Sequence, residues 1–368
     1  MKYINLNYSK IAVSNVGQGM LGIGDPSEYD APRVNKRIET LEYGLSLGIN
    51  LIDTGEDYEL GNCEKVLAEV VKNKRDKIVI STKFKPENNC NEHIRKSLEG
   101  SLKRINTDYI DIYQNQWPNP KVDIRETVET LIDLQQEGKI RAIGIGNLSG
   151  KHLQSLVDSD LIKYVDTFQG EYDVFNQQME TNLFGSLNDH NIKLISYGIR
   201  GSHLLSGRQK LTVSNLMEKY NCDFRGLKLA FSNRKSISLF SSMNHDHIRT
   251  NCGSVDIDLN AEDVEILSSI LKKEVVFVDT NRISIGKVDD ADKTHKIYMT
   301  LDDAKKNELN IFPSATEIAD EILAGDFMRP VELKQLGNDK FVLVRGRMRY
   351  WGWLIAYGIN EKIPSIVI

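Results

Sequence analysis

The sequence has few cysteines, and none are arranged to hold a metal or a disulfide framework. The four are Cys63, Cys90, Cys222 and Cys252, and no two of them form a CxxC pair. Such wide spacing argues against a zinc site and against a small disulfide-rich fold, and it fits a reducing compartment. We therefore expect a cytoplasmic protein without a structural metal.

Long apolar runs are also missing. The first residues, MKYINLNYSKIAVSNVG, contain no apolar core of signal-peptide length, and no window approaches about 18 consecutive apolar residues. The net charge of -5 and the isoelectric point near 5.9 give no overall attraction to nucleic acid or to an anionic membrane. We expect neither of them as a partner.

The sequence does contain enough apolar residues for a large core. Hydrophobic residues make up 40% and charged residues 27% of the 368 positions, a composition typical of globular proteins. Since domains usually span about 100 to 250 residues, this length predicts two domains. We place them at residues 1–272 and 273–368, where the pattern of the sequence changes.

Between Lys10 and Lys272, short apolar runs alternate with amphipathic helical stretches. The runs predict buried strands at residues 49–53, 77–84, 109–114, 142–147, 165–169, 192–198 and 236–242, with an eighth near 17–21. This many strands with helices between them, in about 250 residues, predicts an α/β fold of the (β/α)8 TIM barrel type. A doubly wound open sheet is the alternative, and it is disfavoured because no GxGxxG follows the first strand.

Polar residues stand where the predicted strands end, which in such barrels is the functional face. They comprise one acid, one lysine, several amides and a tyrosine: Asp53, Lys83, Asn115, Gln116, Asn147, Gln169 and Tyr197. Any one of them is explained by a turn, and Asp53 with Lys83 is explained by a buried ion pair. The whole set instead indicates chemistry or ligand binding.

Five segments resemble the aldo-keto reductase family. They are LIDTGEDYELGNCEKVLAE, IVISTKF, EGSLKRINTDYIDIYQNQWPNP, EGKIRAIGIGNLS and FQGEYDVF, and they follow one another in the family's order. The resemblance implies an NAD(P)-dependent oxidoreductase that acts on a small carbonyl or alcohol substrate. It also implies catalytic roles for Asp53, Tyr58 and Lys83.

A proton donor is needed for the oxygen of a carbonyl that receives hydride. Tyrosine, with a pKa of about 10, is a weak donor unless a nearby cation lowers that pKa. We expect Lys83 to lower the pKa of Tyr58, and Asp53 to keep the ammonium charged.

The fourth catalytic position departs from the family pattern YQIHWP. Gln116 stands where the family's histidine orients the substrate carbonyl. A glutamine amide can donate a hydrogen bond but cannot titrate. With Asn115 beside it, Gln116 favours a polar substrate, such as a sugar or a nucleotide-linked sugar.

The resemblance further implies a dinucleotide cofactor, NADP or NAD. Asn147 and Gln169 would hold the nicotinamide carboxamide, and the ring of Tyr197 would stack on the nicotinamide. The other candidate cofactor residues are Gly19, Met20, Gly198, Arg200, Ser241, Asn244, His247 and Asn251. A lysine or arginine normally binds the 2′-phosphate where this chain has Asn244. Preference for NADPH over NADH should therefore be weak, unless Arg249 or a histidine compensates.

From about Glu274 the sequence predicts a second, small α+β domain. EIADEILAGDFMRPVELK and FVLVRGRMRYWGWLIAYG resemble the ParB/sulfiredoxin-like fold. That resemblance implies a nucleotide-phosphate site at Gly346, Arg347 and Arg349, with Glu317 as a functional acid. Two solvated or ion-paired arginines are the plainer alternative. Sulfiredoxin chemistry is not expected, because this domain contains no cysteine.

Three functional hypotheses remain open. The first is an oxidoreductase whose second domain shapes the site. The second is a nucleotide-binding or phosphotransfer protein that acts through residues 273–368, and the third is a dinucleotide sensor without catalysis. Asp53, Tyr58 and Lys83 favour the first, because a sensor needs no proton donor, whereas Gln116 is also compatible with the third.

Overall fold

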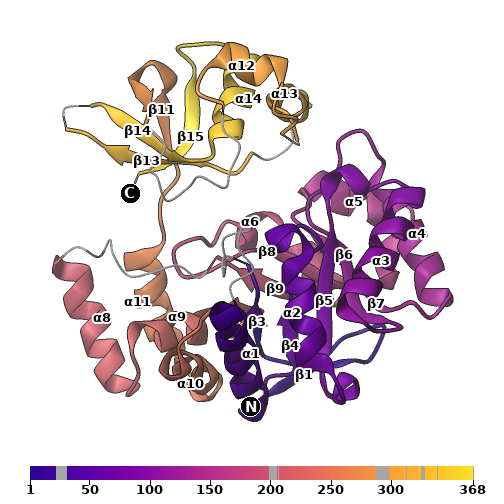
Figure 1. The fold of residues 1–368 in the computed structure, drawn as a ribbon. Coiled ribbons are helices and arrows are strands. Elements are labelled where there is room, and N and C mark those ends of the chain that lie inside the picture. The colour runs from indigo at the N-terminus through magenta and orange to yellow at the C-terminus, as the bar shows by residue number, and fades with distance from the viewer. Residues whose placement is uncertain are drawn as a thin grey trace. The chain divides into compact units, whose positions relative to one another are not determined.

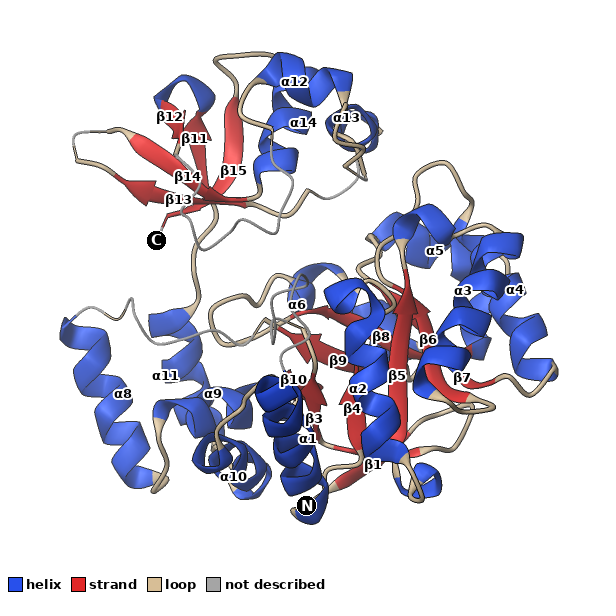
Figure 2. Ribbon diagram, viewed as in Figure 1, coloured by secondary structure: helices blue, strands red, loops and turns tan. Residues whose placement is uncertain are grey.

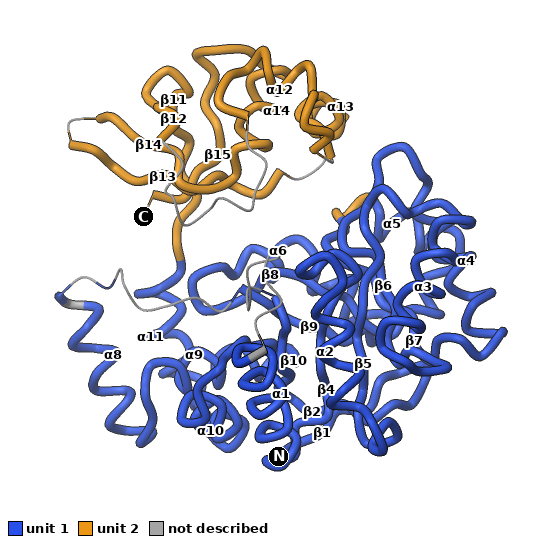
Figure 3. Tube along the Cα trace, in the orientation of Figure 1, with its two compact units in different colours: residues 1–148, 152–272 blue, residues 149–151, 273–368 orange. Residues whose placement is uncertain are grey.

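The structure, a computed structural model, describes residues 1–21, 31–198, 205, 207–286, 298–311, 313–324, 328–337 and 339–367. These residues form two compact units (Figure 3), one of residues 1–148 with 152–272 and one of residues 149–151 with 273–368. Each unit has a sheet and a hydrophobic core of its own.

The first unit is built around a closed barrel of parallel strands (Figure 1). The strands are β3 (Val16–Gly19), β4 (Leu51–Asp53), β5 (Val79–Phe84), β6 (Ile110–Asn115), β7 (Ile140–Gly146), β8 (Val165–Glu171), β9 (Lys193–Tyr197) and β10 (Ile237–Phe240). They follow one another around the barrel, and parallel pairing of β10 with β3 closes it. The predicted TIM barrel is confirmed, and each predicted strand segment overlaps one of these strands.

Helices surround the barrel strands (Figure 2). They are α1 (Ala31–Ser46), α2 (Asn62–Val71), α3 (Asn91–Ile105), α4 (Ile124–Gln136), α5 (Gly150–Asp158), α6 (Met179–Asn182), α7 (Phe184–Asp189), α8 (Gly207–Lys219), α9 (Phe224–Asn233), α10 (His245–Gly253) and α11 (Ala261–Leu271). Helix α3 illustrates the packing, since its buried residues Ile94, Leu98, Leu102 and Ile105 repeat at helical spacing. Asn106, in the left-handed conformation, ends this helix.

A short N-terminal hairpin packs against the amino-terminal ends of the barrel strands. Its strands β1 (Tyr3–Asn5) and β2 (Ala12–Ser14) pair antiparallel. Leu6, Ile11 and Val13 share one buried cluster with apolar barrel residues: Leu51, Val79, Ile112, Ala142, Ile195, Ile237 and Leu239. One end of the barrel interior is therefore filled with apolar side chains, and polar groups concentrate at the other end.

The second unit is built on a mixed sheet in the order β11-β15-β13-β14-β12, together with helices. Its elements are β11 (Val276–Asp279), β12 (Ile283–Ile285), α12 (Leu301–Lys306), α13 (Ala315–Leu323), β13 (Val331–Gln335), β14 (Phe341–Arg345), α14 (Arg347–Tyr357) and β15 (Lys362–Val367). Its core joins Val331 and Leu343 of the sheet to Tyr350 and Trp351 of α14. The described part of the chain contains no helix that is long and apolar enough to cross a bilayer.

Candidate active site

The polar residues singled out in the sequence lie together at the carboxyl ends of the barrel strands. They are Asp53, Lys83, Gln116, Asn147, Gln169 and Tyr197. The parallel strands of a barrel all end on the same rim. Side chains from strands far apart in sequence therefore meet at this rim, which we call the mouth of the barrel.

Lys83 and Asp53 form a buried ion pair in this mouth. Lys83 Nζ lies 2.6 Å from Asp53 Oδ1 and 2.6 Å from the backbone oxygen of Thr54. Burial alone lowers the pKa of Lys83, but the charges and hydrogen bonds of Asp53 and Tyr58 outweigh it and raise that pKa. Lys83 is therefore a permanent cation at neutral pH.

Tyr58 lies beside this ion pair. Lys83 Nζ is 4.9 Å from the centre of the Tyr58 ring, and only 8% of Tyr58 is exposed. Burial raises the pKa of Tyr58 from 10.0 to about 12, although Lys83 acts in the opposite direction. Lys83 does lower the pKa of Tyr58, as expected, but the net shift is upward because loss of water around the phenolate outweighs the attraction of the cation. Tyr58 keeps its proton at neutral pH.

The turn that carries Tyr58 is conformationally strained and braced by Glu56. Glu59 and Leu60 both adopt positive φ angles, 52° and 55°, which non-glycine residues rarely do. Glu56 Oε1 accepts hydrogen bonds from the backbone N–H of Lys85 at 2.7 Å and from Asn88 Nδ2 at 2.8 Å. No pattern in the sequence indicates this bracing role of Glu56, since it depends on a turn that follows β5.

Gln116 and Asn115 have different roles in the structure. Asn115 is fully buried, and its amide exchanges two hydrogen bonds of 2.9 Å with the backbone of Gly146 on β7. The expected use of Asn115 as a polar group near the substrate finds no support here, because both ends of its amide are taken by Gly146. Gln116 directly follows β6 and is half-buried, and its side-chain amide has no hydrogen-bond partner among the described residues. Gln116 is the amide that remains available to a ligand.

Asn147 and Gln169 already make hydrogen bonds within the mouth. Asn147 Nδ2 donates to the backbone oxygen of Gln116 at 2.7 Å, and Asn147 Oδ1 accepts from the hydroxyl of Tyr197 at 2.7 Å. Gln169 Nε2 donates to Asp53 Oδ2 at 2.8 Å. Ser81 donates to the same oxygen at 2.8 Å. Sequence reasoning missed Ser81, although its position two residues before Lys83 places both on one side of the strand.

The remaining candidates near the mouth are less informative. The backbone N–H of Met20 donates to the backbone oxygen of Asp53 at 2.9 Å, next to Gly19 at the end of β3. Gly198 follows β9 with a φ of 88°, a conformation that favours glycine. Arg200 lies outside the described residues.

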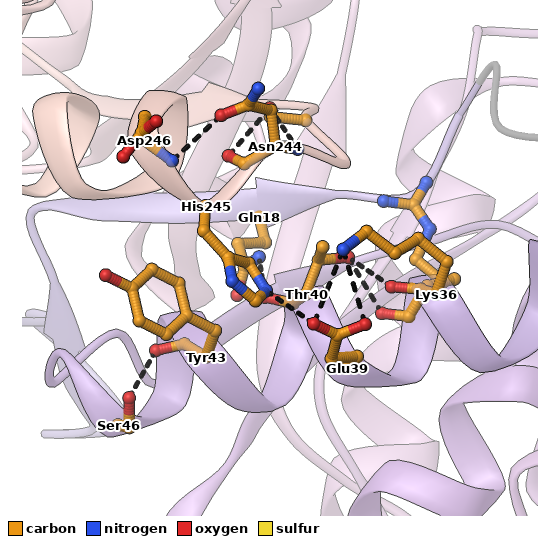
Figure 4. Close-up of polar contacts among 11 residues, drawn as sticks. Gln18, Lys36, Glu39, Thr40, Tyr43, Ser46, Asn244, His245 and Asp246 are labelled. Atoms are coloured by element: carbon orange, nitrogen blue, oxygen red, sulfur yellow. Dashed lines mark hydrogen bonds and ion pairs between the residues drawn. The ribbon is translucent and has the colours of Figure 1, made fainter.

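Figure 4 shows the segment after β10, where the cofactor's adenosine phosphate was expected. Asn244 is the N-cap of α10, and its Oδ1 accepts from the N–H groups of Asp246 at 2.8 Å and His247 at 3.2 Å. His245 stacks on Tyr43 of α1, with ring centres 4.3 Å apart, and its Nε2 lies 3.2 Å from Glu39. The capping hydrogen bonds therefore explain why an asparagine stands at position 244 without any ligand.

The other residues of this segment differ in burial. Ser241 is exposed, and its hydroxyl makes a long contact of 3.4 Å with the backbone oxygen of Leu21. His247 is half-buried. Asn251 is 5% exposed, and its Oδ1 finds no hydrogen-bond donor in the part of the chain that the structure describes. A buried amide oxygen in this state is a candidate ligand contact.

The four residues proposed for a nucleotide site in the second unit all have structural contacts. Glu317 forms a capping box with Ser314 at the start of α13. Arg349 donates to the backbone oxygens of Arg329 at 2.9 Å and Pro330 at 2.8 Å. Arg347 donates to the backbone oxygen of Gly286 at 3.2 Å, and Gly346 is the left-handed N-cap of α14. These contacts give each of the four residues a structural role that requires no bound phosphate.

A metal centre is not indicated. Over the described ranges, no group of three or more histidine, cysteine, aspartate or glutamate side chains is placed to hold a metal ion. The mouth itself offers a lysine, a carboxylate, a phenol and amides.

Comparison with known proteins matches the barrel. The sequence model of the aldo/keto reductase family matches residues 15–272. Aldo-keto reductase YhdN of Bacillus subtilis is 33% identical over 218 residues, which is 56% of this chain and 65% of that protein, just under two thirds of its length. The NADH-specific methylglyoxal reductase of Escherichia coli is 28% identical over 322 residues, covering 73% of this chain and 97% of that protein.

A solved structure shows the same barrel. The crystal structure of an aldo-keto reductase from Klebsiella pneumoniae in complex with NADPH superposes with a TM-score of 0.67 at 25% identity. The match covers 73% of this chain and 95% of that one. The resemblance read from five segments of the sequence is confirmed.

Proposed function

Because the chain belongs to the aldo/keto reductase family of oxidoreductases, we propose that it transfers hydride between NAD(P)H and a small carbonyl compound. The observation that carries this proposal is the cluster of Asp53, Lys83 and Tyr58 at the mouth of the barrel. A buried lysine paired to an aspartate at 2.6 Å, with a protonated phenol beside it, is a proton-donating group rather than a simple ion pair.

Tyr58 supplies the proton to the carbonyl oxygen. Its raised pKa keeps the phenol protonated before reaction. Lys83, fixed by Asp53, then stabilises the phenolate that forms when the proton leaves. Gln116 donates a hydrogen bond from its side-chain amide to the same carbonyl oxygen and so orients it. Since the amide of Gln116 does not titrate, Tyr58 gives the proton in this proposal.

The dinucleotide supplies the hydride when it is bound. The polar groups of the mouth fit such a cofactor, since Gln169 Oε1 has no donor among the described residues and Asn251 Oδ1 is buried without a partner. Tyr197 offers a ring to the nicotinamide, as the sequence suggested. Asn244, which stands where a cation normally binds the 2′-phosphate, is uncharged and caps a helix. We therefore propose that both NADH and NADPH bind.

The substrate proposal rests on Gln116 alone, because Asn115 is bonded to Gly146 and takes no part. An amide donor at this position suits a carbonyl with adjacent oxygen atoms. We propose small aldehydes and ketones of this kind as substrates, with 2-oxoaldehydes and sugars first among them and nucleotide sugars as a later choice.

The test is to measure reductase turnover of the full chain with a panel of carbonyl compounds. The readout is the loss of absorbance of the reduced nicotinamide. We expect Tyr58→Phe to lower kcat/KM by about 100-fold or more, with dinucleotide affinity retained. Gln116→Leu should lower kcat by about 100-fold, and Gln116→His should keep activity because it restores a donor. Absence of NADH and NADPH binding in a fluorescence titration would refute the proposal.

For residues 273–368 we propose the ParB/sulfiredoxin-like fold as a structural relationship only. Its support is the order of elements, in which helix α13 precedes the β13–β14 hairpin and Gly346 begins α14. The nucleotide-binding alternative is not favoured, because the arginines it needs donate to backbone oxygens. A titration of the full chain and its Arg347→Ala variant with ATP tests that alternative.

A further inference from the structure

Tyr58 and Gln116 are proposed to act on one carbonyl oxygen, yet no hydrogen bond between described residues joins them. Tyr58 lies on the turn after β4, and Gln116 directly follows β6. The strand between them is β5, which pairs with β4 on one side and with β6 on the other (Figure 1). The segment that follows β5, residues 85–90, therefore lies between the phenol and the amide. We call it the β5 loop.

Glu56 ties the turn of Tyr58 to the end of β5. Its backbone N–H donates to the backbone oxygen of Lys83 at 3.1 Å, and its Oε1 accepts from the backbone N–H of Lys85 at 2.7 Å. The same Oε1 accepts from Asn88 Nδ2 at 2.8 Å. Glu56 thus bonds both to the strand that carries the catalytic lysine and to the β5 loop. It stands two residues before the proton donor, so it limits how far the turn can move.

Asn89 ties the β5 loop to the segment after β6. It is only 1% exposed, and its Nδ2 donates to the backbone oxygens of Pro86 at 2.8 Å, Trp117 at 3.2 Å and Lys85 at 3.3 Å. The two hydrogens of one amide are therefore shared among three oxygens. One of these oxygens belongs to the residue directly after Gln116. An apolar side chain at position 89 would remove the donor from all three.

We propose that Glu56 and Asn89 are positioning residues, which through the β5 loop hold Tyr58 and Gln116 at one carbonyl oxygen. This inference rests on the proposed function, because the phenol and the amide share a target only in that reaction. Neither Glu56 nor Asn89 touches the reacting atoms. They act on the rate by fixing where the two groups stand.

The expected size of the effect follows from the tolerance of the reaction to misplacement. A displacement of about 1 Å can lower a rate by about 100-fold. The backbone of Gln116 has two further bonds, from its N–H to the oxygen of Phe84 at 3.0 Å and from Asn147 Nδ2 to its oxygen at 2.7 Å. Loss of Asn89 should therefore displace the amide in part and leave residual activity.

Asn119 provides the matched control. Its Nδ2 donates to the same oxygen of Pro86, at 3.2 Å, but its amide makes no hydrogen bond to Trp117 among the described residues. Asn89→Leu and Glu56→Leu remove the two ties, and Glu56→Gln keeps an acceptor in place of the carboxylate. Asn89→Ala serves if circular dichroism shows that the leucine variant does not fold.

The experiment measures turnover of the full chain with the best carbonyl compound of the panel, together with dinucleotide affinity by fluorescence. We expect Asn89→Leu and Glu56→Leu each to lower kcat by about 10–100-fold, with dinucleotide affinity within about twofold. Glu56→Gln and Asn119→Leu should keep kcat within about threefold of wild type. On top of Asn89→Leu, the change Gln116→Leu should cost about tenfold or less, against about 100-fold in the wild-type chain.

A second readout needs no turnover. The chain is labelled with 5-fluorotryptophan, and the fluorine NMR line of Trp117 is assigned with Trp117→Phe. This line should move in Asn89→Leu and stay in place in Asn119→Leu, because only the first change removes a bond to the backbone of Trp117. An unmoved line in Asn89→Leu would show that Asn89 does not hold this segment, and the inference would fall.

The kinetic outcomes separate two failures. If wild type turns over but Asn89→Leu and Glu56→Leu keep full kcat, the positioning role is wrong and the proposed function stands. The role is equally wrong if Gln116→Leu costs the same factor with and without Asn89, or if Asn89→Leu weakens dinucleotide binding as much as turnover. If wild type turns over no carbonyl compound, the proposed function fails and takes this inference with it, and wild type alone reveals that case.

Discussion

The ammonium of Lys83 is almost fully removed from water, since only 2% of the residue is exposed. Its hydration is replaced by Asp53 Oδ1 and the backbone oxygen of Thr54, both at 2.6 Å. Such a pair adds little stability relative to an apolar pair of the same size, but breaking it leaves a buried charge without a partner. Little net stability is therefore expected from the pair, in keeping with the proposed role of Lys83 beside the phenol of Tyr58.

A double-mutant cycle tests this view. We expect Asp53→Asn and Lys83→Met each to lower the free energy of unfolding by about 3–5 kcal/mol, and the double variant to lose less than the sum. The measurement is urea denaturation followed by circular dichroism. The control is Lys74→Met, which breaks an exposed pair with Glu42 of similar length, 2.7 Å, and should cost about 1 kcal/mol or less. Additive effects in the Asp53–Lys83 cycle would contradict the coupling.

Tyr58 gives the site a pH dependence with a known sign. Its pKa in the folded chain, about 12, lies above the ordinary value of 10.0, so the folded state favours the neutral phenol. This contribution to stability is complete below pH 10.0 and is lost as the pH rises toward 12.

We therefore expect wild type to lose more stability than Tyr58→Phe between about pH 9 and about pH 11, by roughly 1 kcal/mol. Urea denaturation at several pH values measures the difference. Tyr8→Phe, at a position that is 47% exposed, controls for loss of an arbitrary tyrosine. Parallel pH curves for wild type and Tyr58→Phe would show that burial of the phenol has no such effect.

At the scale of elements, the barrel strands were predictable from the sequence because most of them contain a short apolar run. A parallel strand covered on both faces must be apolar throughout, so the run itself is the signal. The register explains the position of Asn115. Lys83 pairs with Gln114, and alternate residues face opposite sides of a strand. Asn115 therefore faces away from the side shared by Lys83 and Gln114, and its partner Gly146 is invisible in a single sequence.

The roles at the starts of helices were harder to foresee. A sequence places Asn244, Glu317 and Arg349 near a helix start, but it does not say whether their polar atoms are used by the helix itself. In the structure Asn244 caps α10, Glu317 completes a capping box, and Arg349 donates to two backbone oxygens. Local hydrogen bonds of this kind compete with ligand binding for the same residue types.

Asn244 allows the two roles to be separated. We expect Asn244→Ala to lower the free energy of unfolding by about 1 kcal/mol through loss of the cap, and Asn244→Ser to preserve both stability and dinucleotide affinity. Asn260 caps α11 in the same way, accepting from the N–H of Asp263 at 2.8 Å. Asn260→Ala should therefore match Asn244→Ala in stability. A loss of NADPH affinity in Asn244→Ser would show that this residue binds the cofactor.

At the scale of the whole molecule, the buried residues of the two units fall into separate hydrophobic clusters. The barrel clusters contain residues up to Leu271, and the cluster of the second unit begins at Val278. The prediction of two domains came from the length and a change of pattern in the sequence. The contacts inside the second unit were not predictable, because its strands pair in the order β11-β15-β13-β14-β12, far from sequence order.

Separate cores predict separate folding. We expect residues 1–272, produced alone, to unfold in one cooperative transition at nearly the urea concentration of the barrel transition in the full chain. The tryptophans report on each unit, since Trp117 lies in the first and Trp351 and Trp353 lie in the second. In a full-length Trp117→Phe variant, fluorescence therefore follows the second unit while circular dichroism follows both.

The comparison has two informative outcomes. Different midpoints for fluorescence and circular dichroism in Trp117→Phe, together with a cooperative fragment, would establish a boundary near residue 272. Coincident midpoints, together with a fragment that lacks a cooperative transition, would mean that the barrel needs residues 273–368 to fold. In that case the second unit would be a structural part of the oxidoreductase, and the site residues would have to be tested only in the full chain.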